Sequence, residues 1–255
     1  MTKDGSESAP AREIPRAQDQ LFREPGGARA KYSALIVGRP GLPALVKYEL
    51  IVLFTQGVPG ALGLVLRKTW YPRLLGSCGR NVVFGQNVVL RHPHKIHIGD
   101  NVVIDDNCLL DAKGVTNRGI QIGSGVFIGR NTILSCKNGD IVIEHGANIG
   151  FNCELFSANR VRVGSDTLIA AYAYLVGGDH DAADPSQPVL HQQRRATGID
   201  VGVGAWLGAG AKILDGVTIG DRGIIGAGAV VRDAVPAGAT AVGIPARVLD
   251  RKANA

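Results

Sequence analysis

Through much of this chain one aliphatic side chain returns every six residues, and this period limits the folds that the chain can adopt. In residues 201–231, six such positions follow one another without an insertion. A helix repeats every 3.6 residues and a half-buried strand every two, so a period of six favours short strands joined by regular corners. A repeat of fixed period indicates a solenoid, in which stacked units bury one continuous core.

The aliphatic positions group in threes, so that three hexads make one coil with three faces. They are Phe84 and Leu90; Ile98, Ile104 and Leu110; Ile122, Ile128 and Leu134; Ile143, Ile149 and Leu155; and Val163, Ile169 and Leu175. Extra residues occur only after the third member of a triplet, so one corner in three tolerates insertions. A β-sandwich with glycine turns is the alternative, but its strands would not keep this register. We therefore predict an all-β solenoid of about seven three-sided coils, with parallel strands from neighbouring coils side by side.

The composition agrees with a narrow prism that small and aliphatic side chains fill. The chain has 35 Gly, 45% hydrophobic residues and only 5% aromatic residues. Its net charge of +6 suits an anionic ligand or serves general solubility, and no basic run of the nucleic-acid-binding type is present. The four cysteines form no CxxC pair and no signal-peptide pattern opens the chain, so we expect reduced thiols in the cytoplasm.

The chain before the repeat has a different character. Residues 1–30 are rich in charge, Pro, Gly and Ala, which predicts a disordered tail. Residues 31–76 predict a helical extension, whose apolar part at 42–66 is interrupted at Gly57–Gly60 and is a poor membrane-spanning helix. Two short helices could cap the solenoid, or they could lie at the inner face of a membrane with basic residues near the headgroups. These basic residues are Lys47, Arg67, Lys68 and Arg73.

The solenoid is predicted over residues 77–238, with a closing turn and tail at 239–255, and its largest insertion is at 176–198. Long excursions from a rigid scaffold often carry function. His180 stands near the root of this loop and has an aspartate on each side. It could act as a general base that a carboxylate orients, or it could be a solvated loop histidine.

Two segments near the C-terminal end carry a family resemblance. Gly-Ala-Trp-Leu-Gly-Ala-Gly-Ala-Lys-Ile-Leu-Asp-Gly-Val-Thr-Ile-Gly (204–220) and Val-Gly-Ile-Pro-Ala-Arg (242–247) look like the final coils and closing turn of the hexapeptide-repeat acyltransferases. The resemblance covers residues 78–250 and is closest to the sugar and polysaccharide O-acetyltransferases. It implies a left-handed parallel β-helix, acetyl-CoA as acyl donor, and a glycan hydroxyl as acceptor.

The resemblance also implies roles on the acceptor side. His180 matches the family's catalytic histidine, which deprotonates the acceptor hydroxyl for direct attack on the thioester. Asn152, in Gly-Phe-Asn-Cys, matches an asparagine that positions the acceptor, although Gly150 replaces the first asparagine of that motif. Asp179 and Asp181, which flank His180, are expected beside the acceptor.

On the donor side, the resemblance implies that Trp206 lines the acetyl-CoA tunnel. The backbone around Ala209 and Ala227 would bond the pantetheine amides, and Arg247 would meet the CoA phosphates. The family usually has Thr-Lys where this chain has Arg-Asp at 232–233, so Arg232 is the candidate for the displaced cation.

The repeat itself predicts how these residues are distributed. It puts His180 at the third corner of its coil, Asn152 on the second face, and Trp206 at the first corner of the next coil. Side chains on different sides of one prism do not converge, so we predict a homotrimer with sites between neighbouring prisms.

Several rival functions fit the same solenoid. A metal-dependent carbonic anhydrase needs three histidines, but neither His145 nor His180 has a partner five residues later, and His92, His94 and His97 are expected to be exposed. We therefore expect no metal. An N-acetyltransferase on an aminosugar would use the same histidine, but residues 1–75 show no βαβ pattern. A serine acetyltransferase would have a longer helical domain, and a non-catalytic structural solenoid would need neither the His180 loop nor Trp206.

Overall fold

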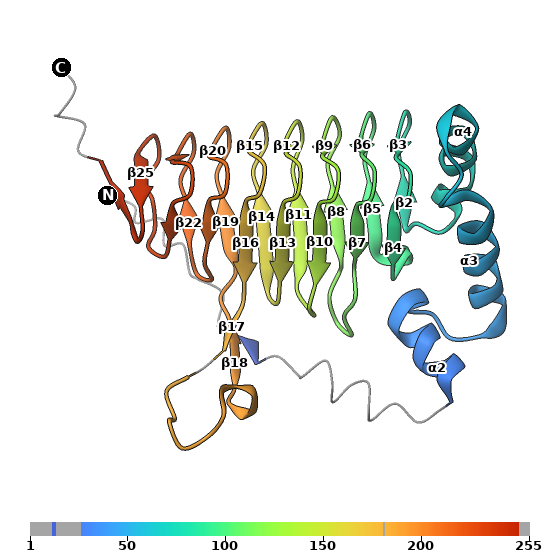
Figure 1. Ribbon diagram of the computed structural model, residues 1–255, viewed down its shortest axis with the longest axis horizontal. Helices are drawn as coiled ribbons and strands as arrows, with labels where there is room; N and C mark the ends of the chain where they lie inside the picture. Colours follow the sequence, from blue (N-terminus) through green and yellow to red (C-terminus); the bar gives the residue numbers. More distant parts are fainter. Residues whose placement is uncertain (1–11, 14–26, 181, 250–255) are drawn as a thin grey trace, which may run out of the picture.

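The computed structural model describes residues 12–13, 27–180 and 182–249. It is a parallel β-solenoid of about eight turns with helices at its N-terminal end (Figure 1). The predicted fold class is confirmed, with one turn more than predicted because Cys78 begins the first coil and Val235 and Ala241 add to the last. Most of the tail predicted at 1–30 lies outside the described residues.

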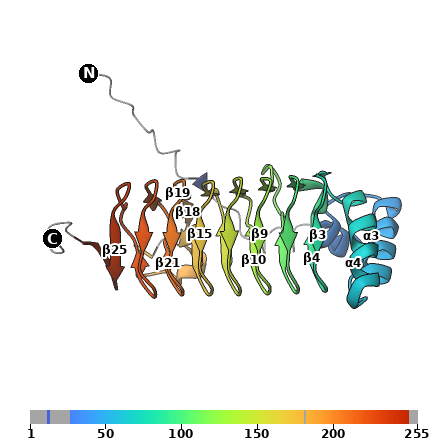
Figure 2. The ribbon, with the colours of Figure 1, turned by 90° about the horizontal axis from the view of Figure 1, so that it is seen from above.

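Each face of the solenoid is one parallel sheet in which successive strands come from successive coils (Figures 1 and 2). The first face consists of β2 (Ser77–Cys78), β5 (Ile96–Ile98), β8 (Ile120–Ile122), β11 (Asp140–Ile143), β14 (Arg160–Val163), β19 (Ile199–Val201) and β22 (Thr218–Ile219). The third face consists of β4 (Val89–Arg91), β7 (Leu109–Asp111), β10 (Ile133–Cys136), β13 (Glu154–Ser157), β16 (Tyr174–Gly177), β21 (Lys212–Ile213) and β24 (Val230–Val231).

The second face is the longest sheet and ends in an antiparallel pair. It consists of β3 (Val83–Phe84), β6 (Val103–Ile104), β9 (Phe127–Ile128), β12 (Asn148–Ile149), β15 (Leu168–Ile169), β20 (Trp206–Leu207), β23 (Ile224–Ile225), β25 (Thr240–Gly243) and β26 (Ala246–Val248). Matching hexad positions pair directly, as Ile128 does with Ile104 and Ile149. All three are fully buried, so each face contributes one aliphatic row to the core.

The two corners without insertions turn in the same way in every coil. The third residue after each first-face or second-face aliphatic position has a positive φ, which Gly and Asn adopt at the lowest cost. At the first corner these residues are Asn81, Asn101, Gly125, Gly146, Asp166, Gly204, Arg222 and Gly238. At the second corner they are Asn87, Asn107, Asn131, Asn152, Tyr172, Gly210 and Gly228. The third corner follows no such rule, because the insertions occur there.

The N-terminal helices cover the first coil. They are α2 (Ala28–Tyr32), the π-helix η1 (Ser33–Val37), α3 (Leu42–Thr55), α4 (Gly60–Trp70) and the 3-10 helix η2 (Tyr71–Arg73). The inner side of α3 buries Tyr48, Ile51 and Thr55, and the Tyr48 hydroxyl donates to the Leu90 carbonyl at 2.8 Å. Two further 3-10 turns, η3 (Pro93–Lys95) and η4 (Val189–His191), lie at the third corner. Within the described part of the chain, none of the helices is long and apolar enough to cross a membrane.

Arg67 shows how firmly the cap is attached. Its Nε donates to the Phe84 carbonyl at 2.9 Å, and Nη1 donates to the carbonyls of Thr55 at 3.0 Å and Val58 at 2.7 Å. The expectation that Arg67 lies near lipid headgroups is therefore wrong, since the residue is 1% exposed and serves the packing of α4 on the first coil.

Candidate active site

His180 lies on a short hairpin that leaves the third corner of the fifth coil and projects from the solenoid (Figure 1). Strand β17 (Asp179–His180) pairs antiparallel with β18 (Arg194–Ala196), and β1 (Arg12–Glu13) adds a third strand. The side chain of His180 is exposed. The structure thus places this histidine at the root of the largest insertion, within reach of a molecule in solution.

Of the two aspartates beside His180, the structure describes only Asp179. Asp179 Oδ1 accepts a hydrogen bond from the backbone N–H of His180 at 2.7 Å, so this carboxylate binds the main chain. Asp181 lies outside the described residues. Within the described chain, no carboxylate hydrogen-bonds to the His180 ring, and a group that orients it would come from elsewhere.

Arg194, which sequence reasoning did not select, lies opposite His180 in the hairpin. Its Nε is buried without a hydrogen-bond partner among the described residues. A buried charged donor without an acceptor is costly, so Nε is suited to receive an anionic or carbonyl oxygen. The adjacent arginines at 194–195 were the sequence signal that could have identified it.

Asn152 occupies the turning position of the second corner in the fourth coil, not the second face as predicted. Its φ is 54°, and its Oδ1 accepts from Asn131 Nδ2 at 3.0 Å. Asn87 and Asn107 form the same kind of pair at 3.2 Å two coils earlier. Asn152 therefore supports the corner, and a role toward the acceptor would be additional.

Tyr172 follows Asn152 at the same corner and breaks the pattern of small residues. Its φ is 64°, and its side chain is 67% exposed. Its backbone N–H donates to the Phe151 carbonyl at 2.9 Å, so the turn stacks on that of Asn152. A bulky side chain in the left-handed region is strained, and such strain often accompanies a functional position. The sequence signal was a tyrosine where the hexads otherwise place Asn or Gly.

The predicted donor-side residues lie on the second face and second corner of the sixth and seventh coils. Trp206 is on β20, between Leu168 and Ile224, and not at a first corner as predicted. It is 49% exposed, and its two neighbours are exposed apolar residues as well. Ala209 and Ala227 are exposed at the second corner, where the Ala209 carbonyl accepts from the Gly228 N–H at 2.8 Å. Pantetheine has both apolar methylene groups and amide groups, so an apolar strip beside exposed backbone has the chemistry to bind it.

The two arginines assigned to CoA phosphates come together at the C-terminal end. Arg232 Nε lies 3.5 Å and Arg247 Nη1 3.7 Å from the same Asp233 Oδ2. All three side chains are more than half exposed, so these contacts are weak. The carboxylate offsets part of the positive charge, which makes this pair a less favourable phosphate site than two unpaired cations.

The histidines and cysteines of the repeat do not form a metal centre. His92 is buried, contrary to the expected exposure, and its Nε2 donates to the Ala34 carbonyl at 2.8 Å. Across the described residues, no group of three His, Cys, Asp or Glu side chains is placed to hold a metal ion. All four cysteines are free, and burial raises the pKa of Cys108 to about 12.

The residues proposed for one site lie at two separate corners of the prism. Asn152, Tyr172, Ala209 and Ala227 stack along the second corner, while His180 lies beyond the third. The two corners of a coil are separated by a hexad of extended backbone, which spans up to about 20 Å. A single prism therefore does not bring His180 to the second corner.

Two descriptions of known families match this chain. Residues 199–233 match "Bacterial transferase hexapeptide (six repeats)", and residues 77–112 match "Hexapeptide repeat of succinyl-transferase". Nodulation protein L of Rhizobium meliloti is 40% identical over 131 residues, covering 50% of this chain and 68% of that protein. Nodulation protein L of Rhizobium leguminosarum is 50% identical over 102 residues, covering 39% of this chain and 52% of that protein. The match with this second relative thus spans only about half of its length.

A solved structure with the same architecture is a variant of AntD, an N-acyltransferase from Bacillus cereus, in complex with dTDP and coenzyme A. The likeness covers 77% of this chain and 91% of that chain, at 22% identity and a TM-score of 0.51. At this level of identity the comparison concerns the fold alone.

Proposed function

The chain belongs to the hexapeptide-repeat acyltransferase family, and on that premise we propose that it moves an acetyl group from acetyl-CoA to a hydroxyl of a sugar, a polysaccharide or a glycolipid precursor. The observation that carries the proposal is the position of His180, exposed at the root of the one large insertion in an otherwise regular solenoid. The hairpin and Trp206 argue against a non-catalytic structural solenoid.

In the proposed reaction His180 acts as a general base. Its imidazole takes the proton of the acceptor hydroxyl as the oxygen attacks the thioester carbonyl of acetyl-CoA. The tetrahedral intermediate expels the CoA sulfur, and the imidazolium returns the proton to that thiolate. General base catalysis of this kind contributes about 10²–10⁴-fold to the rate. No acyl-enzyme is needed, and the buried cysteines are poor nucleophiles because burial raises their pKa.

The proposed site lies between the prisms of a homotrimer. One prism would supply His180 from its third corner, and its neighbour would supply Trp206 and the backbone around Ala209 and Ala227 from its second face and corner. The separation of these corners within one prism supports this arrangement. Asn152 would orient the acceptor in addition to its corner role, and Arg232 and Arg247 would meet the CoA phosphates despite Asp233.

The proposed location is the cytoplasm, with peripheral contact of residues 42–66 at the inner face of a membrane. While the inner side of α3 caps the solenoid, its outer side exposes an apolar row, and Phe54 and α4 continue the exposed apolar surface. The row on α3 consists of Leu42, Val46, Leu50 and Leu53. Lys47 and Lys68 are exposed nearby, and Arg73 stacks on Trp70 at 4.5 Å, which suits an anionic lipid surface. In this proposal, capping and membrane contact are functions of opposite sides of α3.

Cosedimentation with vesicles containing anionic phospholipid tests this contact. The Leu50→Asn/Leu53→Asn variant should lose binding and keep its melting temperature, whereas Val115→Asn, an exposed apolar residue outside the cap, should bind like the parent protein. Equal sedimentation of all three proteins would contradict the proposal. If the Leu50→Asn/Leu53→Asn variant loses self-association and not lipid binding, the apolar row contacts a second copy of the chain.

Acetyl-CoA turnover with a panel of sugars, glycolipids and aminosugars tests the proposed reaction. We expect transfer to a hydroxyl acceptor and a loss of at least about 100-fold in kcat/KM for His180→Ala. His145→Ala, an exposed histidine at a first corner, is the matched control and should retain full activity. Unchanged turnover in His180→Ala would remove its catalytic role, and transfer only to aminosugars would replace O-acetylation by N-acetylation.

A further inference from the structure

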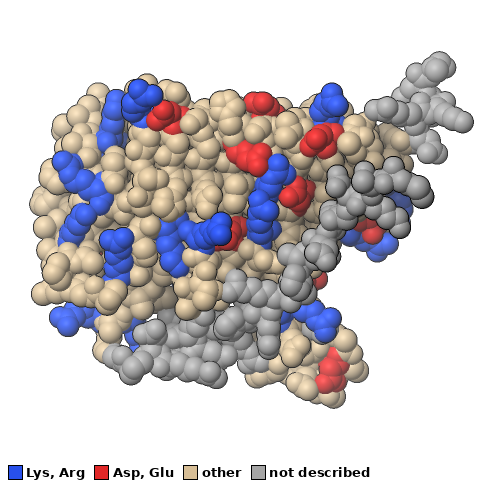
Figure 3. Space-filling view, turned by 180° about the vertical axis from the view of Figure 1, so that it is seen from behind, with Lys and Arg blue, Asp and Glu red and all other residues tan. Residues whose placement is uncertain are grey.

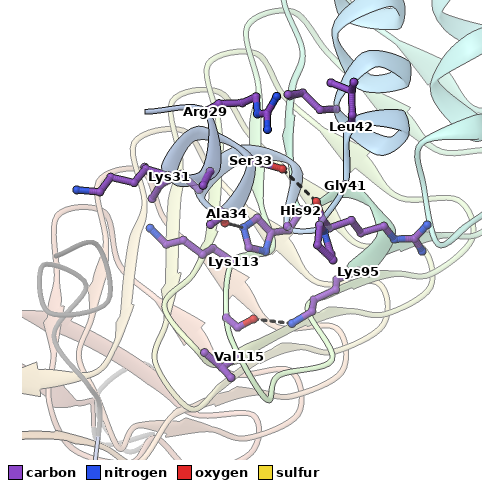
Figure 4. A pocket seen from close by; sticks show the side chains of 17 residues that line it. Arg29, Lys31, Ser33, Ala34, Gly41, Leu42, His92, Lys95, Lys113 and Val115 are labelled. Carbon is purple, nitrogen blue, oxygen red and sulfur yellow. Dashed lines mark hydrogen bonds between the residues drawn. The ribbon is translucent and has the colours of Figure 1, made fainter. Parts of the chain in front are cut away.

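A cavity of about 630 Å³ lies between the N-terminal helices and the third corner of the first two coils. Five cationic side chains line it, and none of the described residues that line it carries a carboxylate; the five are Arg29, Lys31, Arg39, Lys95 and Lys113. Figure 4 shows Arg29, Lys31, Lys95 and Lys113 around it, with His92 and Ala34 in its wall. Like charges held around one hollow repel each other, so this arrangement favours a bound anion.

The wall of the cavity is built rigidly. The His92 backbone N–H donates to the Ile36 carbonyl at 2.7 Å, and its ring donates to Ala34. Gly38, at φ 70°, passes so close to the His92 ring that a Cβ would lie 2.6 Å from it. The ring keeps η1 against the first coil, and burial lowers the pKa of His92. The positive charge of the cavity therefore comes from its lysines and arginines.

Among the described residues, the Lys95 ammonium group has two hydrogen-bond acceptors. Its Nζ donates to the Gly114 carbonyl and to Asn117 Oδ1 at 2.9 Å. An ammonium group has three donors, and both of these acceptors are neutral oxygens. Burial lowers the pKa of Lys95, as expected for a cation without a carboxylate bonded to it. An anion in the cavity would offset this charge.

The cavity connects with His180 through a column of basic residues at the third corner. Lys113 and Lys137 are each the third residue after a buried leucine, in successive coils. The Lys113 carbonyl accepts from the Asn138 N–H at 3.3 Å, and the Lys137 N–H donates to Ser157 at 2.6 Å, which continues the stack toward Gly177. Burial lowers the pKa of Lys137, and the nearby charges of Arg194 and Lys113 lower it further.

Two carboxylates near this column bond to the main chain, and Asp111 Oδ2 also lies 3.7 Å from Arg91 Nη1. Asp111 Oδ1 accepts from the Lys113 N–H at 3.1 Å, and Asp140 Oδ1 accepts from the N–H groups of Arg118 at 2.7 Å and Gly119 at 2.9 Å. The helical end of the solenoid carries mainly Lys and Arg on the face seen in Figure 3. The column ends at Arg194, whose buried Nε has no described partner.

We infer that the cavity binds a phosphate group of the acceptor, and that the acceptor extends from there along Lys113 and Lys137 to Arg194 and His180. Three coil spacings separate Lys113 from the root of the His180 hairpin, or about 14 Å at 4.8 Å per coil. The acceptor is thus an anionic, phosphate-bearing glycan precursor and not a neutral sugar. The identification of the acceptor as a glycan precursor rests on the proposed function, whereas phosphate binding in the cavity does not.

Binding of inorganic pyrophosphate, followed by titration calorimetry at constant low ionic strength, tests the cavity alone. Lys31→Gln and Lys113→Gln should each weaken binding about tenfold, the effect of losing one charge-assisted contact. Lys212→Gln, an exposed lysine on the third face of the sixth coil, should bind like the parent protein. Absence of binding, or equal binding by all four proteins, would overturn the cavity site.

Acetyl transfer to a neutral sugar, to the same sugar as its phosphate, and to a lipid-linked sugar phosphate tests the acceptor class. We expect at least about tenfold higher kcat/KM for the phosphates, and Lys113→Gln should lower the kcat/KM for the phosphates and so reduce this preference. A preference for the lipid-linked form would identify a membrane source, and equal use of both phosphates a soluble one. If pyrophosphate binds but the neutral sugar is preferred, the acceptor class is wrong; if no acceptor is acetylated, the proposed function fails while the cavity site stands.

Discussion

The first two corners of the prism and the third corner follow different rules. At the first two, a left-handed residue stands three positions after each aliphatic residue in coil after coil. At the third corner the chain leaves the repeat, and it is here that the cationic cavity, the basic column and the His180 hairpin lie. Both kinds of corner connect strands that are equally well buried, so the difference is not one of core packing.

The difference indicates how this chain combines stability with function. Two corners maintain the register of every coil, because their backbone N–H groups bond to the corner of the coil before, as Gly204 does to Ser165 at 2.8 Å. The third corner also bonds to neighbouring coils, as Gly216 does to Gly198 at 2.8 Å, but without a fixed pattern, and it carries insertions of different length. Strain at the regular corners is limited to a few residues such as Tyr172.

An insertion at each kind of corner should have the largest effect. Two residues, Gly-Ser, placed between Val203 and Gly204 would separate the first corner from its neighbours and break their hydrogen bonds. We expect loss of cooperative folding, or a melting temperature lower by more than about 10 °C. The same insertion after Val115, which is 73% exposed at the third corner, should change it by less than about 2 °C. If thermal denaturation shows the same change in melting temperature for both insertions, the corners do not differ in their tolerance of insertions.

The two roles of Asn152 can be separated by a matched pair of variants. Glycine tolerates the positive φ but removes the side-chain ladder, so Asn152→Gly and Asn131→Gly should lower the melting temperature to a similar extent. Only Asn152→Gly should also raise the KM for the acceptor, by about tenfold for one lost hydrogen bond to substrate. If KM stays constant in both variants, Asn152 is a corner residue alone.

Tyr172 provides a smaller test of strain at the second corner. Tyr172→Asn should raise the free energy of unfolding by about 1 kcal/mol, because asparagine adopts the left-handed region more readily than tyrosine. Denaturant unfolding measures the change. Tyr174→Asn, whose position is an ordinary strand, is the control and should not be stabilised. A destabilised Tyr172→Asn would show that the tyrosine makes contacts that outweigh its strain.

A pH dependence is expected at the third corner of the first coil. Burial, followed by the charges of Arg39, His92 and Lys95, lowers the pKa of His94 from 6.5 to about 4. Between these values the unfolded chain binds a proton and the folded chain does not, so stability is complete above pH 6.5 and falls as the pH decreases toward 4. The melting temperature of His94→Gln should therefore fall less than that of the parent protein between pH 7 and 5. Parallel curves for the two proteins would contradict this assignment.

The sequence predicted the coils because the aliphatic residue of each hexad is buried in the core of the prism, as Ile128 and Ile149 are. It also predicted the insertion that carries His180. It misplaced Asn152 and Trp206, since the period of six does not by itself show where a strand ends and a corner begins. The sequence did not predict the burial of Arg67 and His92. Each is buried by contacts with segments far from it in the chain, which a local pattern does not show. The cavity depends on the same long-range packing.

A mixture of two inactive variants tests most directly whether the site is built from the third corner of one prism and the second face of the next. His180→Ala and Trp206→Ala are each expected to be nearly inactive as homotrimers. If subunits assort randomly in mixed trimers, about a quarter of the sites unite an intact His180 with an intact Trp206 from a neighbour, and about a quarter of the parent activity returns. Mixed trimers that remain inactive, or a parent protein that is active as a monomer, would contradict the account.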